Sequence, residues 1–187
     1  MDERLLDKIA EPFNLQLPDY QSMEEMLDDI LPEVRGYSEP SFEDEDASLN
    51  VVEWVKMSDQ PGATKINLWS FEPGSEIRIV SDGELSNKFY SVEGPRRIVI
   101  GDGMYRNAIL YELAFMDRDF LIVQRHGNQE NIRGKKYLVF CREAIGTRLV
   151  WHEALTRLVD KYRNSQFPWA GVLVIIAVLL GALVYFR

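Results

Sequence analysis

Eight short apolar runs, separated by turn signals, dominate the middle of the sequence and constrain its fold most strongly. The runs are rich in β-branched and aromatic residues, and several alternate between apolar and polar positions. These features are typical of strands with one buried face. Glycine, proline, asparagine and aspartate stand between the runs, which are VVEWVKM (51–57), TKINLWSF (64–71), SEIRIVS (75–81), NKFYSV (87–92), RRIVIGD (96–102), RNAILYEL (106–113), DFLIVQR (119–125) and KKYLVFCRE (135–143).

The spacing of these runs predicts a mainly β domain over residues 47–146. The runs follow one another at hairpin distance, and no crossover helix fits between them. About eight antiparallel strands in roughly 100 residues form a small barrel or a sandwich. The residues expected to face inward are bulky, which favours a filled interior: Trp69, Phe71, Ile77, Ile79, Phe89, Ile98, Ile100, Leu121, Val123 and Phe140.

The order of motifs along residues 69–142 carries a resemblance to a known family. The motifs are W-S-F-x-P-G-S-E-I (69–77), Asp82-Gly83, Tyr90-x-Val92-x-Gly94, Ile98-x-Ile100, Tyr105, Leu113, Asp119-x-Leu121-x-Val123 and Leu138-x-Phe140-x-Arg142. This order resembles the bacterial lipocalin-like domains. The resemblance implies an up-and-down antiparallel barrel, in some members with a ligand cavity, and it implies no catalytic set. The chain lacks a clear G-x-W near the start of the barrel and has short loops, which argues against a large cavity.

An amphipathic helix is predicted after the barrel, at 147–166, with Thr147 as its N-cap. Its apolar side carries Val150, Trp151, Ala154, Leu155, Leu158 and Tyr162. We expect this side to pack across the sheet; the alternative is that the helix lies on a bilayer surface. A seven-stranded sheet closed by a C-terminal helix containing tryptophan is also how pleckstrin-homology domains end, so a PH-like barrel is the alternative fold.

Residues 1–46 form an acidic N-terminal arm, with fifteen Asp or Glu and three Lys or Arg. The segment 22–31 begins with a capping box, Ser22 followed by Glu25, and Pro32 follows it. The acidic stretch 38–48 is expected to be a solvated linker. A helix this short must pack its stripe on the main domain or on a partner to be ordered. Because a purely solvating arm needs no apolar stripe, the stripe on 22–31 predicts a partner-docking element, formed by Met23, Met26, Leu27, Ile30 and Leu31. The alternative is that the stripe belongs to the core of the barrel domain.

The C-terminal segment 167–187 is predicted to be a single transmembrane helix. Residues 168–186 would span about 28 Å as a helix, close to the ~30 Å hydrocarbon thickness of a bilayer. Trp169 and Tyr185 are placed to anchor it at the two interfaces. Small residues predict close packing of one helix face against another membrane helix: Gly171, Ala177, Gly181 and Ala182.

The flanks of this segment predict its orientation. Arg157, Lys161 and Arg163 precede it, and Arg187 follows it. Because basic flanks stay in the cytoplasm, the barrel is expected on the cytoplasmic side of a tail-anchored, single-pass membrane protein. The single cysteine, Cys141, has no partner for an internal disulfide, which agrees with a reducing compartment.

Residues that carry chemistry are few and scattered. His126, His152 and Cys141 give no metal spacing, and no nucleotide-binding or nucleophile motif occurs. Gly101-Asp102-Gly103 is expected to be a hairpin turn, and Glu112, Asp117 and Asp119 to be ordinary surface carboxylates. Five basic residues are expected to meet anionic headgroups or the acidic arm: Arg96, Arg97, Arg133, Lys135 and Lys136.

Two functions of different classes follow from these observations. The first is a non-enzymatic accessory or assembly subunit of an integral membrane protein complex, without a cofactor, in which the barrel and the acidic arm dock partners. The alternative is a membrane-tethered binder of a small lipophilic ligand, such as a lipid, quinone or pigment. A formal net charge of −9 without a basic stripe argues against nucleic-acid binding.

Deletion of residues 167–187 is predicted to release a soluble, folded domain, because no other run in the chain is apolar enough to enter a bilayer. Membrane fractionation of the truncated and full chains, with circular dichroism of the released protein, tests this. Retention of the truncated chain in the membrane fraction after a high-salt wash would contradict a single anchor.

Overall fold

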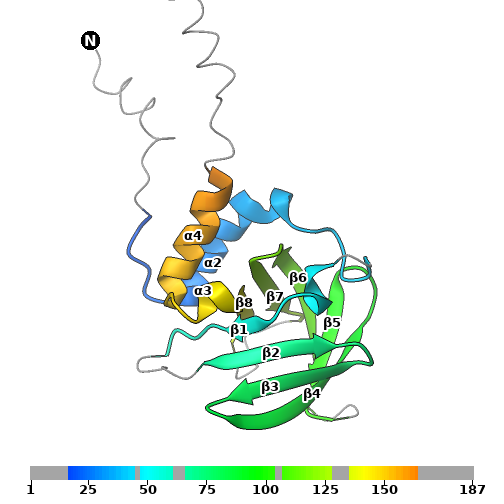
Figure 1. Cartoon of the computed structure of the whole chain (residues 1–187). Coiled ribbons are helices and arrows are strands. Elements are labelled where there is room, and N and C mark those ends of the chain that lie inside the picture. Colours follow the sequence, from blue (N-terminus) through cyan, green and yellow to red (C-terminus); the bar gives the residue numbers. More distant parts are fainter. Residues whose placement is uncertain (1–16, 45–46, 61–65, 104–106, 128–134, 164–187) are drawn as a thin grey trace, which may run out of the picture.

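The structure, a computed structural model, describes residues 17–44, 47–60, 66–103, 107–127 and 135–163. It consists of a β-barrel with helices packed on one side (Figure 1). In chain order the elements are α2 (Met23–Val34), η2 (Arg35–Tyr37), η3 (Ser48–Asn50), β1 (Trp54–Lys56), β2 (Asn67–Glu72), β3 (Glu76–Ser81), β4 (Glu84–Val92), β5 (Arg97–Gly101), β6 (Ile109–Met116), β7 (Phe120–Arg125), β8 (Tyr137–Arg142), α3 (Glu143–Gly146) and α4 (Trp151–Arg163).

The eight strands form a closed antiparallel barrel in sequence order. Each strand pairs with the next, and β1 pairs with β8 to close the ring, with Val55 opposite Cys141. Closure removes the exposed edges that an open sheet would present. The predicted mainly β barrel with a C-terminal helix is therefore confirmed, and it is compatible with a lipocalin-like fold. The PH-like alternative expected a seven-stranded sheet, and the described strands number eight.

The barrel interior is filled by large side chains. Trp54, Phe140 and Ile77 are fully buried there, and the rings of Trp69 and Phe140 lie 5.2 Å apart. Nine of the ten residues predicted to face inward belong to this core. Phe89 is the exception: it lies opposite Glu76 on the outer surface and is 45% exposed.

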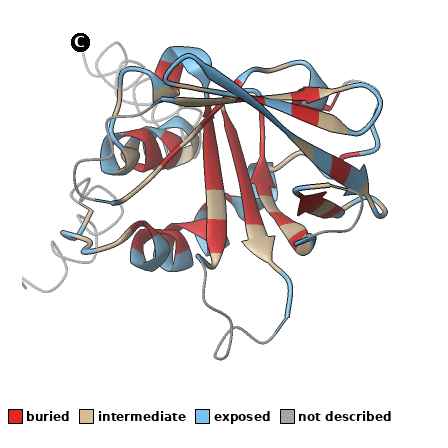
Figure 2. Ribbon diagram, turned by 90° about the horizontal axis from the view of Figure 1, so that it is seen from below, coloured by how far each residue is buried: buried red, intermediate tan, exposed pale blue. Residues whose placement is uncertain are grey.

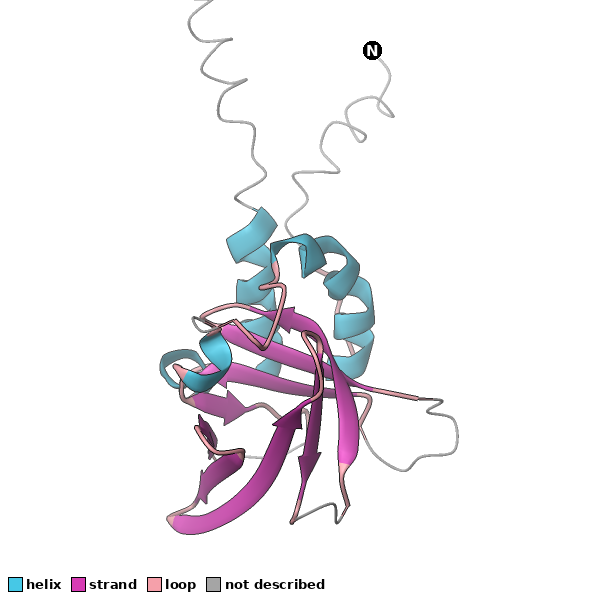
Figure 3. Cartoon of the chain, turned by 90° about the vertical axis from the view of Figure 1, so that its right-hand side faces the viewer, coloured by secondary structure: helices cyan, strands magenta, loops and turns pink. Residues whose placement is uncertain are grey.

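A second apolar core lies outside the barrel, between its wall and the helices. Strand β7 shows why it forms: Phe120 and Ile122 belong to this outer core, whereas Leu121 and Val123 face the interior. Both faces of the strand are therefore buried, as the red strands beside the helices show (Figure 2). Burial of each such side chain contributes about 1.5–3 kcal/mol relative to exposure. Helices α2 and α4 lie side by side over this wall (Figure 3).

The segment before β1 contributes to the interior core instead of forming a solvated linker. Phe42, Ala47 and Leu49 are buried together with the barrel residues. The Phe42 amide donates to the Pro95 carbonyl over 2.8 Å, which ties the segment to the β4–β5 turn. The expectation of a solvated linker over 38–48 was therefore wrong for Phe42 and Ala47, because their apolar side chains cover the barrel core at this end.

The C-terminal helix packs its apolar side on the domain, as expected. Ala154, Leu155 and Leu158 are buried in the outer core. Two details differ from the prediction. Thr147 follows the end of α3, and its hydroxyl donates to the carbonyl of Glu143, the first residue of that helix, so Thr147 does not cap α4. Val150, just before α4, is 52% exposed. Of the helices that the structure describes, none has the length and apolar character needed to cross a membrane.

Substitution Gly146→Ala is predicted to destabilise the domain by about 2 kcal/mol, because overpacking at a close contact costs about 1–3 kcal/mol. A Cβ atom at this position would lie 2.5 Å from the Val55 Cβ of β1. Chemical denaturation of the full chain measures the effect. Gly36→Ala is the matched control, since a Cβ there would meet no atom within 4 Å. Equal stability of the two variants would contradict close packing of α3 on β1.

Candidate docking surface

Helix α2 begins after Ser22, the N-cap that its sequence predicts. The Ser22 side chain accepts a hydrogen bond from the Glu25 amide over 3.2 Å, and the Glu25 carboxylate accepts from the Gln21 amide over 2.9 Å. Carboxylates in the first turn also interact favourably with the helix dipole. The helix runs on to Val34 with Pro32 inside it, so the predicted stop before Pro32 was wrong. Val34 is buried in the outer core, and this packing offsets the hydrogen bond that proline cannot donate.

The apolar stripe of α2 is buried against the chain's own domain. The stripe packs in the outer core with α4 and the barrel wall, and it comprises Met23, Met26, Leu27, Ile30 and Leu31. These are the residues that the sequence analysis assigned to partner docking. In this structure they present no exposed surface to a partner, because the same stripe that would bind a partner helix also fits the apolar wall of β6–β8.

Polar contacts fix the other parts of α2 to the barrel. Asp28 accepts hydrogen bonds from the Lys136 ammonium over 2.5 Å and from the Tyr137 hydroxyl over 2.7 Å. Burial alone would raise the pKa of Asp28, but the hydrogen bonds from Lys136 and Tyr137 outweigh burial and lower it. The Met23 amide also donates to Asp59, which forms an ion pair with Lys135.

The solvent side of α2 is an exposed acidic face, formed by Glu24, Glu25, Asp29 and Glu33. Within the described part of the chain, these four carboxylates form no ion pair, although Glu25 and Asp29 accept hydrogen bonds from Gln21 and Tyr20. Because the opposite side of the helix is buried, the acidic face is held in a fixed orientation. Such a face attracts a basic surface and accelerates its association.

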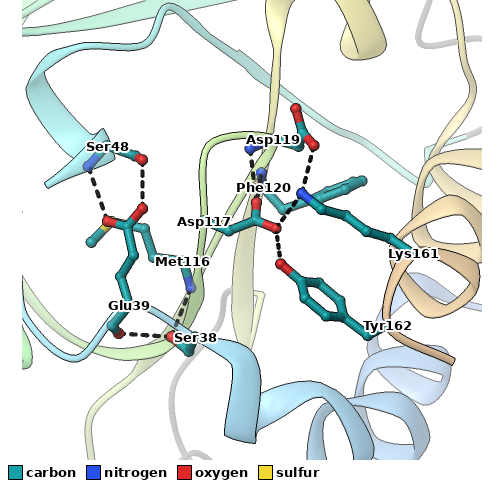
Figure 4. Close-up of polar contacts among 9 residues, drawn as sticks. All are labelled: Ser38, Glu39, Ser48, Met116, Asp117, Asp119, Phe120, Lys161 and Tyr162. Carbon is teal, nitrogen blue, oxygen red and sulfur yellow. Dashed lines mark hydrogen bonds and ion pairs between the residues drawn. The ribbon is translucent and has the colours of Figure 1, made fainter. Parts of the chain in front are cut away.

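Helix α4 is held to the barrel by a buried carboxylate, Asp117, which is 7% exposed (Figure 4). Asp117 accepts hydrogen bonds from the amides of Asp119 and Phe120, from the Lys161 ammonium over 2.8 Å and from the Tyr162 hydroxyl. Burial alone would lower the pKa of Lys161, but its hydrogen bonds to Asp117 and Asp119 outweigh burial and raise it. The last turn of α4 is thereby fixed to the β6–β7 turn.

The segment between α2 and β1 is attached beside this cluster (Figure 4). The Ser38 hydroxyl accepts from the Met116 amide over 3.0 Å, and Glu39 accepts from both the amide and the hydroxyl of Ser48. These contacts join the chain before β1 to the end of β6. Hydrogen bonds and apolar packing together therefore hold the helices and the connecting segment to the barrel.

An open groove of about 570 Å³ lies near the β6–β7 turn. Its walls include exposed Arg118, Arg142, Glu53 and Glu143. Both charge signs are present, so the groove does not select strongly between anionic and cationic groups.

The five basic residues that were expected to meet anionic headgroups or the acidic arm do not share one partner. Lys136 forms an ion pair with Asp28 of the acidic arm, which is one of the two predicted contacts. Lys135 forms an ion pair with Asp59, which follows β1. Arg97 pairs with Glu112 instead, and the Arg96 guanidinium donates to the carbonyls of Pro40 and Leu113. Arg133 lies outside the described residues.

The residues screened for chemistry do not form a reactive cluster. Glu112 binds His126 over 2.9 Å, whereas Asp117 and Asp119 bind Lys161. Cys141 is buried, and burial raises the pKa of its thiol to about 12, which suppresses the reactive thiolate. Among the described residues, no three His, Cys, Asp or Glu side chains are arranged to hold a metal ion.

The remaining predicted residues lie outside the described part of the chain. These are the interface anchors Trp169 and Tyr185 and the small residues expected to pack in the membrane, Gly171, Ala177, Gly181 and Ala182.

Substitution Asp28→Asn is predicted to lower the stability of the full chain at neutral pH by about 1 kcal/mol, the usual contribution of such hydrogen bonds. Because the folded-state pKa of Asp28 is depressed, its contribution is complete above the ordinary value of 3.8 and disappears as the pH falls through the folded-state pKa. Denaturation over a pH series, with exposed Glu84→Gln as control, tests this. A difference that stays constant at low pH would contradict the ionic role.

No protein-family model, no curated protein and no solved structure matches this chain. The resemblance to lipocalin-like domains is thus supported by the closed eight-stranded barrel of the structure, and by none of these comparisons.

Proposed function

We propose that this protein is a non-enzymatic accessory or assembly subunit of a membrane protein complex. The C-terminal segment 167–187 anchors it as a single-pass, tail-anchored protein, and its barrel domain docks a partner on the cytoplasmic side. The observation that carries the proposal is the rigidly held acidic face of α2, formed by Glu24, Glu25, Asp29 and Glu33.

The partner surface follows from the charge of this face. Four carboxylates without an ion pair in the described residues repel one another, and a basic surface relieves this repulsion. The stripe of α2 is already buried, so the acidic face is the part of the helix open to a partner. Because this face is already ordered, docking has little of the ordering cost that a disordered arm would incur.

The attachment of α4 supports an anchored arrangement. Lys161 and Tyr162, directly before the proposed anchor, are bonded to Asp117 at the β6–β7 turn. Helices α4 and α2 are therefore held to the same barrel, so the acidic face of α2 has a fixed orientation relative to the last described turn of α4. A fixed orientation of this kind suits a subunit that docks a neighbour in the same membrane.

The filled interior supports docking over transport of a lipophilic ligand. A carrier needs an apolar cavity, whereas in the barrel core the rings of Trp69, Phe71 and Phe140 are in mutual contact and Trp54 is buried with them. A lipid, quinone or pigment would have to displace these rings. For this reason we rank the carrier function below the docking function.

Substitution of Glu24 and Glu33 by Gln is predicted to reduce recovery of the partner complex several-fold while the anchor stays intact. Both side chains are exposed, so the fold should be unchanged. Quantitative affinity purification from solubilised membranes, at low and high salt, measures the effect. The matched control is Glu43→Gln with Glu84→Gln, which removes the same charge from the connecting segment and β4. Equal recovery of the two double variants, without salt dependence, would overturn docking by the acidic face.

A further inference from the structure

Three cationic side chains project from the inner face of the barrel. Residues directly opposite one another in an antiparallel pair point to the same side of a sheet. Each cation lies opposite a residue of the interior core and therefore points to the inner face. Lys56 lies opposite Phe140, Lys88 opposite Ile77 and Arg125 opposite Tyr111. Charges on the inner face of a small barrel are unusual, because such interiors are filled by apolar side chains.

Lys56 is the most informative of the three. Its ammonium lies 5.4 Å from the centre of the Trp69 ring, and no carboxylate forms an ion pair with it among the described residues. The nearby cations Lys88 and Lys135 already have carboxylate partners, Asp102 and Asp59. Burial, together with the charges of Lys135 and Lys88, lowers the pKa of Lys56. A largely buried ammonium without a counter-ion is costly, and an anion would relieve that cost.

The inner face is accessible where these cations lie. Ser86 is on the inner face, opposite Ile79, and is nevertheless exposed, and Lys88 is half-buried. The end of the barrel beside the β4–β5 turn is instead covered by Phe42 and Leu49. Among the described residues, the exposed part of the inner face therefore lies at the end of the barrel away from the β4–β5 turn, where Lys56 also lies.

The size of the ligand follows from what lies beneath Lys56. Trp69 and Phe140 fill the interior below the ammonium, so a long acyl chain has no room in the barrel. A lysine ammonium is a compact point charge that binds carboxylate and phosphate oxygens. We propose that the barrel opening binds the phosphate or carboxylate group of a small anion against Lys56, with the Trp69 ring beneath it and the rest of the ligand outside.

The experiment uses the full chain in zwitterionic detergent micelles, with lysines labelled by reductive ¹³C-methylation, which preserves their charge. Inorganic phosphate and acetate are titrated at constant ionic strength, and the methyl signal of Lys56 is assigned by its loss in Lys56→Arg. We expect a saturable shift of this signal and a raised Lys56 pKa in the bound state. Binding should weaken as the pH rises through that pKa, since only the charged ammonium attracts the anion.

Variants separate a specific site from general electrostatics. Lys56→Gln should weaken binding of the anion at least about tenfold, equivalent to ~1.4 kcal/mol. Lys56→Arg should retain most of the affinity. In both variants, binding is measured from the shift of the Lys88 methyl signal. The matched control is Arg78→Gln, which removes a cation from the exposed outer face of β3. If Lys56→Gln does not fold, the wild-type titration decides alone. Unsaturable shifts shared by all lysines, or equal binding by Lys56→Gln and the wild type, would overturn the proposal.

The source of the anionic group is identified in a parallel titration. A short-chain anionic phospholipid is compared with a zwitterionic one of equal chain length. A saturable Lys56 shift with free phosphate or acetate, and none with the anionic lipid, supports a soluble anion. A shift that requires the anionic lipid supports a headgroup. No Lys56 response in any of these titrations would overturn the site.

Discussion

The burial of strand β7 on both faces is the constraint on which the rest of the structure depends. Leu121 and Val123 belong to the barrel core, and Phe120 and Ile122 would be exposed if the barrel stood alone. Because large exposed apolar patches are unstable in water, this wall requires a cover. Helices α2 and α4 provide this cover. Helix α2 precedes the barrel strands in the sequence and α4 follows them, so both belong to one domain with the barrel.

This arrangement gives each helix a buried side and a side that faces solvent. The apolar stripe of α2 is used for the wall, and its carboxylates are left in solvent. In α4, Leu155 and Leu158 pack on the domain, and the Asp117 cluster fixes the last turn. The same packing that stabilises the domain thus orients both the acidic face of α2 and the last described turn of α4.

Much of the fold was predictable because local patterns and tertiary packing agree. The eight apolar runs, the N-cap Ser22 and the apolar side of α4 each appear where the sequence indicates. What could not be predicted depends on register or distant packing. Phe89 lies outside because β4 pairs Lys88 with Ile77, and Phe42 is buried because the acidic segment covers an end of the barrel. For the site, the carboxylates of α2 could be read from the sequence, but the burial of its stripe and the inward position of Lys56 required the closed barrel.

Hydrogen exchange of the α2 backbone amides in the isolated full chain tests most directly whether this helix belongs to the domain. Opening α2 would expose the stripe together with Phe120 and Ile122 of the wall. We therefore predict that the amides of residues 26–31 and 33–34 are protected to nearly the same degree as those of β7, since both require disruption of the outer core. Rapid exchange of all these α2 amides, while β7 stays protected, would contradict this and would show that the helix is not held by the domain of the isolated chain.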